Sequence, residues 1–192
     1  LSDEMEGVKA IGSRLNNIIQ VKGDAANKKW ATYIEIRGIT FAHADRLPED
    51  QWPDEWIMRN FQNPDAAIRL EGVEDCKIEG NTILNPGAFG IGVYQHGLRN
   101  EIIGNEIGYS GSGGVSLSGS YVGGDDQSRY NWVERNYIHH PGQVYNKSGG
   151  VLIINSGFNK VANNFVYATP YAAMQTAGVT DLDWNIKRDP VK

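Results

Sequence analysis

Short apolar segments recur along the chain in two alternating patterns. The first pattern opens with a small residue and then alternates apolar and polar positions, as a strand with one buried face does. Its copies are residues 17–23, 67–72, 90–94, 114–119, 150–154 and, in degraded form, 172–176. The second pattern is a strand, a two-residue corner carrying asparagine, and another short strand. Its copies are residues 77–83, 102–107, 132–138 and 160–166, and residues 36–41 have Ile39 where the asparagine would be.

The first pattern returns at a nearly constant distance. Its openings at Ile68, Ile91, Val115, Val151 and Ala173 are 23, 24, 36 and 22 residues apart, so one repeat is enlarged. Strands this short cannot bury a face alone, whereas stacked repeats bury one another. We therefore predict an all-β fold, a right-handed single-stranded parallel β-helix (a β-solenoid) of about five coils, with three short strands in each coil.

Four asparagines occupy the same place in successive copies of the second pattern. They are Asn81, Asn105, Asn136 and Asn164. Asparagine tolerates the left-handed backbone of a tight corner, and its amide can bond to the copies above and below. We expect these four side chains to stack at one corner of the solenoid.

The repeats divide the chain into three parts. Residues 1–16 contain no copy and are expected to precede the solenoid, which spans residues 17–178 and is followed by a C-terminal tail at 179–192. The acidic and aromatic stretch at 181–184 is expected to cover one end. Because Leu1 is not an initiator residue and no signal peptide precedes it, we expect a fragment of a longer protein that has further coils.

Composition excludes several classes of partner. The net charge is −5, from 18 basic and 23 acidic residues without a basic cluster, so neither nucleic acid nor an anionic membrane is expected as a partner. No apolar run approaches the roughly 18 residues that a membrane span needs. No metal-ligand spacing and no phosphate-binding glycine motif are present, so we expect no metal and no cofactor.

Three insertions interrupt the repeats, at residues 44–66, 120–130 and 140–149. The second leaves the end of a first-pattern strand and the third enters the beginning of the next one. Both insertions should therefore border the sheet that these strands form, on opposite sides, and solenoids commonly bind on the face that carries insertions. The outward positions of this sheet are Arg69, Gly92, Tyr94, Ser116, Ser118, Leu152 and Ile154. We predict a polar and aromatic trough here, suited to a sugar chain.

The candidates for catalysis are Asp125, Asp126 and His140. Adjacent carboxylates repel each other, so one of the two aspartates can keep its proton and act as an acid. An imidazole beside the trough could transfer protons near neutral pH. The simpler interpretations are a solvated Gly-Gly-Asp-Asp turn for the aspartates and a packing role for the histidine.

A larger set is expected to bind substrate because its members are aromatic, charged or hydroxylated and border the trough. The set consists of Tyr94, His96, Ser116, Ser118, Arg129, Tyr145, Lys147, Trp52, Trp56, His43 and Asp45. Loop packing is the alternative for Tyr145 and Lys147, and core or lid packing for the two tryptophans.

Residues 36–45, 131–142, 145–151 and 155–159 resemble segments of bacterial right-handed parallel β-helix proteins of the pectate-lyase-like superfamily. The similarity covers about residues 17–178 and is nearest to glycoside hydrolase family 141. It implies a secreted or periplasmic enzyme in which two acidic residues bracket a glycosidic bond. Asp125 or Asp126 matches one of them, and no clear match exists for the second. Apart from Glu71, the first-pattern strands lack the calcium-binding carboxylates of related lyases.

We therefore expect a glycoside hydrolase acting on a polysaccharide or oligosaccharide. Two alternatives stay open, because this superfamily supports several chemistries. One is a lyase or epimerase that uses Tyr145, His140 or Lys147 as base and acid. The other is a non-catalytic solenoid that binds sugar or has a structural role.

Overall fold

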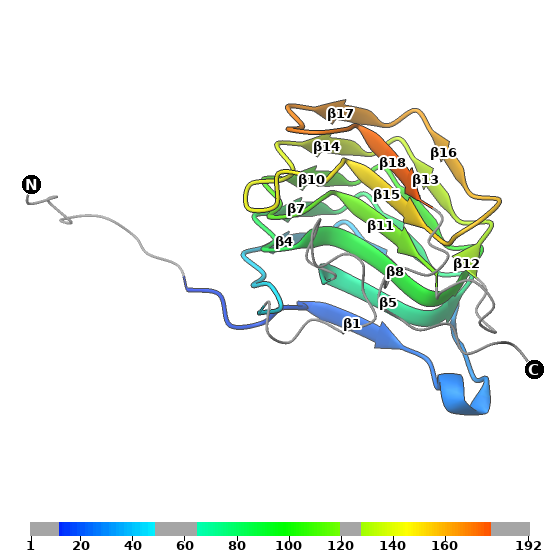
Figure 1. Cartoon of the computed structure of the whole chain (residues 1–192). Coiled ribbons are helices and arrows are strands. Elements are labelled where there is room, and N and C mark those ends of the chain that lie inside the picture. The colour runs from blue at the N-terminus through cyan, green and yellow to red at the C-terminus, as the bar shows by residue number, and fades with distance from the viewer. Residues whose placement is uncertain (1–11, 49–64, 120–127, 178–192) are drawn as a thin grey trace, which may run out of the picture.

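A computed structural model describes residues 12–48, 65–119 and 128–177 and shows five coils of a parallel β-helix, followed by the first strand of a sixth (Figure 1). The strands lie in three stacked parallel sheets. The predicted fold class is confirmed.

The first sheet carries the first-pattern strands. Its order is β1-β5-β8-β11-β15-β18, with the short β2 and β12 paired beside β5 and β8. The strand bounds are β1 Ile19–Lys22, β2 Ala31–Thr32, β5 Ala66–Glu74, β8 Phe89–Leu98, β11 Val115–Ser118, β12 Ser128–Arg129, β15 Val151–Ile154 and β18 Met174–Ala177. A 3-10 turn, Ala25–Asn27, lies between β1 and β2.

The second-pattern strands form the other two sheets. The second sheet has the order β3-β6-β9-β13-β16, and the third sheet has the order β4-β7-β10-β14-β17. The second-sheet bounds are β3 Glu35–Arg37, β6 Lys77–Glu79, β9 Glu101–Ile103, β13 Trp132–Glu134 and β16 Lys160–Ala162. The third-sheet bounds are β4 Thr40–Ala42, β7 Thr82–Leu84, β10 Glu106–Gly108, β14 Tyr137–His139 and β17 Phe165–Tyr167.

The register of the first sheet agrees with the predicted repeat in all copies but the last. Ile68, Ile91, Val115 and Val151 are aligned and completely or almost completely buried. The sixth strand differs, because Met174 and not Ala173 is paired with Val151. Ala173 instead accepts the Val151 N–H through its carbonyl, as Gly150 does for Val115. The alternation at 172–176 is too weak to fix which residues face inward.

The four predicted asparagines stack in a ladder. The Nδ2 of Asn81 donates to the Oδ1 of Asn105 at 3.0 Å, and the same bond joins Asn105 to Asn136 and Asn136 to Asn164. Each acceptor oxygen also takes the backbone N–H of the asparagine one coil before it. The ladder therefore satisfies buried polar groups at the corner between the second and third sheets.

A second ladder, which we did not predict, lies at the other edge of the second sheet. Asn100 donates from Nδ2 to the Oδ1 of Asn131 at 2.9 Å, and Asn131 donates to Asn159 at 3.1 Å. In the coil before them, the backbone N–H of Cys76 donates to the Oδ1 of Asn100. The signal was present in the sequence, because each of these asparagines stands five residues before an asparagine of the first ladder.

The first prediction concerns the ladder. Asn105→Ala should lower the free energy of unfolding by about 2–4 kcal/mol, because it leaves the buried Asn81 backbone N–H without its acceptor and removes one of the two acceptors of the Asn81 side-chain amide. Urea unfolding measures the change. Asn146→Ala, on an exposed turn, is the matched control and should change stability by less than about 0.5 kcal/mol. Equal effects of the two substitutions would show that the ladder does not stabilise the stack.

Candidate functional site

The outward side chains of the first sheet form two rows, as the sequence predicts. One row contains Arg69, Gly92, Ser116 and Leu152, and the other contains Glu71, Tyr94, Ser118 and Ile154. The predicted sugar-binding trough runs along these two rows of side chains.

The middle of this surface is closed to solvent, which corrects the expectation of an open hydroxylated floor. Tyr94, Ser116 and Ser118 are at most 2 % exposed, and the two serine hydroxyls are 2.9 Å apart. The Tyr94 ring lies over Gly92, where a Cβ atom would be 2.2 Å from the ring. Burial raises the pKa of the Tyr94 phenol far above its ordinary value, so it stays protonated. These three side chains cannot contact a sugar in this conformation.

A charged cluster lies at the β1–β5 side of the same surface. The Arg69 guanidinium is 3.6 Å from the Asp65 carboxylate and 3.3 Å from the Glu71 carboxylate, and it lies 4.4 Å above the Tyr94 ring. Lys22 pairs with Glu71 at 3.1 Å, and the Asn17 amide donates to Asp65. We call these residues, Asp65, Arg69, Glu71 and Lys22, the carboxylate cluster.

The cluster combines two carboxylates with partial solvent access. The side chains of Asp65 and Glu71 are 5 % and 12 % exposed, whereas those of Arg69 and Lys22 are 22 % and 60 % exposed. The two cations of the cluster balance its two carboxylates in formal charge, and Glu71 is the carboxylate with more solvent access. From the sequence, Glu71 was identified only as the single acidic residue on the first-pattern strands. Asp65 was missed, because it precedes its strand and no acidic residue occupies the equivalent position in the other repeats.

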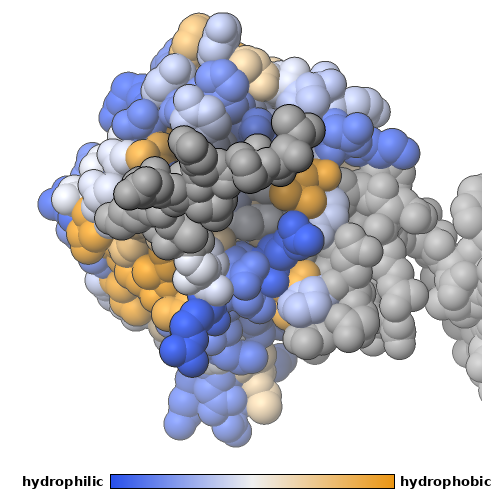
Figure 2. Space-filling view, turned by 90° about the vertical axis from the view of Figure 1, so that its left-hand side faces the viewer, coloured by the Kyte–Doolittle hydropathy of each residue, from blue (hydrophilic) through white to orange (hydrophobic). Residues whose placement is uncertain are grey.

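Parts of two insertions meet where the first-sheet strands begin. The Arg46 guanidinium lies 5.9 Å from the centre of the Tyr145 ring, and Lys147 is exposed on the same loop. His43 is half-buried at a corner with φ +61°, and Asp45 is exposed. The 140–149 loop is the yellow loop at the left of Figure 1, and Figure 2 views that side, where hydrophobic and hydrophilic patches adjoin. Tyr145, Lys147, His43 and Asp45 thus lie on one border of the surface.

The opposite border holds His96 in an internal network. Its Nε2 is 2.8 Å from the Glu74 carboxylate, and its ring stacks on Trp30 at 3.7 Å. Arg99 bonds to both Glu74 and Asp75, and its hydrogen bond lowers the pKa of the Asp75 carboxyl below the ordinary value. His96 is therefore held by side chains of the protein.

The remaining candidates are placed elsewhere. Arg129 is half-buried in β12, beside Leu98 of β8. His140 does not lie on the outward rows of the first sheet. It follows β14 at the corner equivalent to that of His43 after β4, and its ring stacks on Tyr109 at 4.8 Å. Its positive φ of +48° turns the side chain away from the direction that simple strand alternation implies. Trp52, Trp56, Asp125, Asp126 and the 181–184 stretch lie outside the described residues.

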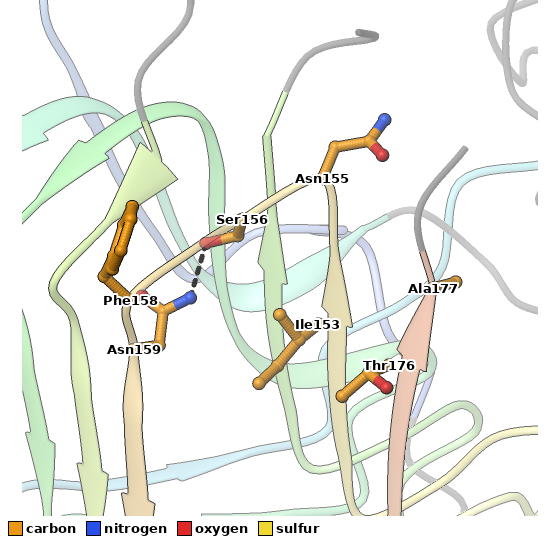
Figure 3. Close-up of a pocket in the computed structure, with 7 residues that line it drawn as sticks. All are labelled: Ile153, Asn155, Ser156, Phe158, Asn159, Thr176 and Ala177. Atoms are coloured by element: carbon orange, nitrogen blue, oxygen red, sulfur yellow. Dashed lines mark hydrogen bonds between the residues drawn. The ribbon is translucent and has the colours of Figure 1, made fainter. Parts of the chain in front are cut away.

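A hollow of about 420 Å³ lies at the far end of the described coils (Figure 3). Its lining comprises Ile153, Asn155, Ser156, Phe158, Asn159, Thr176 and Ala177. Ile153 and Thr176 are paired neighbours in the inward row of the first sheet, so the hollow is the uncovered interior of the last coils. None of the predicted site residues lines it.

Among residues 12–48, 65–119 and 128–177, no three His, Cys, Asp or Glu side chains converge as metal ligands. The same part of the chain contains no helix with the length and hydrophobicity that a membrane crossing requires.

Comparison with known proteins agrees with the architecture. The family model described as "right handed beta helix region" matches residues 66–183, and the chain belongs to this family. No curated protein matches the chain. No solved structure matches it either.

The second prediction tests the balance of charge in the carboxylate cluster. Arg69→Met should lower the free energy of unfolding by about 2–4 kcal/mol, because two largely buried carboxylates lose their shared cation. Arg37→Met is the control, since Arg37 is about half exposed and pairs with carboxylates on the outside of the second sheet. It should cost less than about 1 kcal/mol. If urea unfolding gave the same cost for both, Arg69 would not be the centre of the cluster.

Proposed function

We propose that this protein is a polysaccharide-active β-helix protein that hydrolyses glycosidic bonds on the outer face of its first sheet. One observation carries the proposal. Glu71 lies in the same outward row as Ser118, with Tyr94 between them, and Ser118 is the last residue of β11 before the insertion that contains Asp125 and Asp126. Two strand spacings separate Glu71 from Ser118, a distance of about 10 Å.

This arrangement supplies the two kinds of carboxyl group that the reaction needs. Glycoside hydrolysis uses one carboxylic acid to protonate the leaving oxygen and one carboxylate on the other side of the bond. Glu71, paired with Arg69 and Lys22, provides one of the two carboxyl groups. Asp125 or Asp126 provides the acid, because neighbouring carboxylates share their protons. We assign Glu71 to the role of the second acidic residue, for which the family resemblance gave no clear match.

The borders of the surface fit a sugar chain. Tyr145 and Arg46 form an aromatic and cationic pair at one border, and Lys147, His43 and Asp45 add hydrogen-bonding groups there. Aromatic faces pack against sugar rings, and charged groups bond to hydroxyls. The membership of the chain in the β-helix family supports the same class of substrate.

The third prediction assigns a role to Glu71. On a substrate found in a polysaccharide panel, Glu71→Gln should lower kcat/KM by about a hundredfold or more, since the amide cannot stabilise positive charge. Glu101→Gln is the matched control, because Glu101 is also ion-paired to a lysine but lies on the second sheet. It should leave kcat/KM unchanged. A folded Glu71→Gln protein with full activity would remove Glu71 from the site.

The fourth prediction concerns the acid. Asp125→Asn with Asp126→Asn should reduce the release of new reducing ends by about a hundredfold or more, while thermal unfolding stays unchanged. Ultraviolet absorbance of the products distinguishes hydrolysis from elimination, because only a lyase creates a double bond. Strong absorbance, with activity retained in the double variant, would replace hydrolysis by the lyase alternative that uses Tyr145 or Lys147.

A further inference from the structure

Two adjacent histidines on the third sheet direct their rings toward each other. Neighbouring residues of an extended strand point to opposite faces. His139 ends β14, but His140 adopts the left-handed conformation with φ +48°, which brings the two rings together. Their Nδ1 atoms are 3.1 Å apart. The four histidines of the chain are His43, His96, His139 and His140, so this pair includes half of them.

The His139 ring is held in one orientation by its surroundings. The Glu106 carboxylate lies 3.4 Å from its Nε2 atom, and Tyr109 and Tyr137 contact the ring from two directions at 5.0 and 4.8 Å between centroids. Beneath it lies Gly108, where a Cβ atom would be 2.3 Å from the ring. One tautomer of His139 carries its proton on Nε2, beside the Glu106 carboxylate. The lone pair of Nδ1 is then left facing His140.

We propose that His139 and His140 bind one divalent transition-metal ion of the copper, nickel and zinc group through their two Nδ1 atoms. Imidazole nitrogens lie about 2.0–2.1 Å from such an ion, so two ligands of one ion are about 2.9–3.4 Å apart. The observed separation falls inside this range. A carboxylate commonly lies beside the other ring nitrogen of a metal-binding histidine, and Glu106 lies 3.4 Å from Nε2 of His139.

Water completes the coordination, because the described residues place no third His, Cys, Asp or Glu ligand at the pair. The binding is therefore weaker than that of a four-ligand structural zinc site. The pair is separate from the carboxylate cluster, since His140 lies at the third-sheet corner and the cluster lies on the first sheet.

A hydrogen bond between the two Nδ1 atoms has the same length as the observed separation. The two interpretations differ in chemistry. A metal ion displaces the proton that the hydrogen bond requires, so binding is saturable, stoichiometric and dependent on both rings. A hydrogen bond alone gives the pair no more affinity for metal than His43 or His96 has.

The fifth prediction is tested by calorimetric titration of the folded protein with Zn²⁺, and by electron paramagnetic resonance of the Cu²⁺ complex to count nitrogen ligands. One ion should bind per chain, with two imidazole nitrogens on Cu²⁺. His140→Asn should weaken binding about tenfold or more, and His139→Gln should do the same. Asparagine suits the corner at 140, because Asn85 occupies the equivalent corner with φ +52°.

The other two histidines supply matched controls. His43→Asn makes the same substitution at a corner of the same type, with φ +61°, and His96→Gln matches the change at 139. Both should leave Zn²⁺ binding unchanged, and circular dichroism checks that all four variants fold. Binding that persists in both His139→Gln and His140→Asn would overturn the site, as would the absence of saturable binding to the wild-type protein. Loss of hydrolase activity would not affect this inference.

Discussion

The solenoid depends on the pairing of buried amides between successive coils. Backbone N–H groups at a tight corner face the coil next to them, away from water, and each needs an acceptor there. In both ladders one asparagine oxygen takes the backbone N–H and the side-chain amide of the asparagine in the preceding coil. Each such hydrogen bond contributes about 1 kcal/mol, but an unpaired group would cost more, so the ladders also exclude other registers.

The ladders also determine where the chain can vary. The interval between the two ladders is five residues in each of three coils, from Asn100 to Asn105, Asn131 to Asn136 and Asn159 to Asn164. An extra residue inside this interval would break one ladder or the other. The insertions at 44–66, 120–130 and 140–149 all lie outside it and flank the first sheet. The candidate site therefore lies where the chain can gain residues without disrupting the stacked coils.

The sequence was sufficient for the fold and most of the register, because period-2 alternation and aligned asparagines report directly on stacking. The sequence was insufficient where apolar and polar residues do not alternate clearly. Ala173 and Met174 are both apolar, and the alignment of Ala173 with Val151 that we chose was wrong by one residue. Alternation assigned Tyr94 and Ser116 to the outer face correctly but says nothing of whether that face is open to solvent. The direction of His140 depends on a positive φ, which no neighbouring residue type requires.

The unequal exposure of the two cations indicates how the carboxylate cluster can meet a ligand. Lys22 is 60 % exposed, and an ion pair with so much solvent around it contributes little to stability. Arg69 is more buried and bridges both carboxylates, so its removal would leave charge without a partner. In the proposed hydrolysis, exchange of Lys22 for a sugar hydroxyl beside Glu71 would therefore cost little, while Arg69 would hold the carboxylate in place. The same surface can in this way stabilise the fold and remain available for binding.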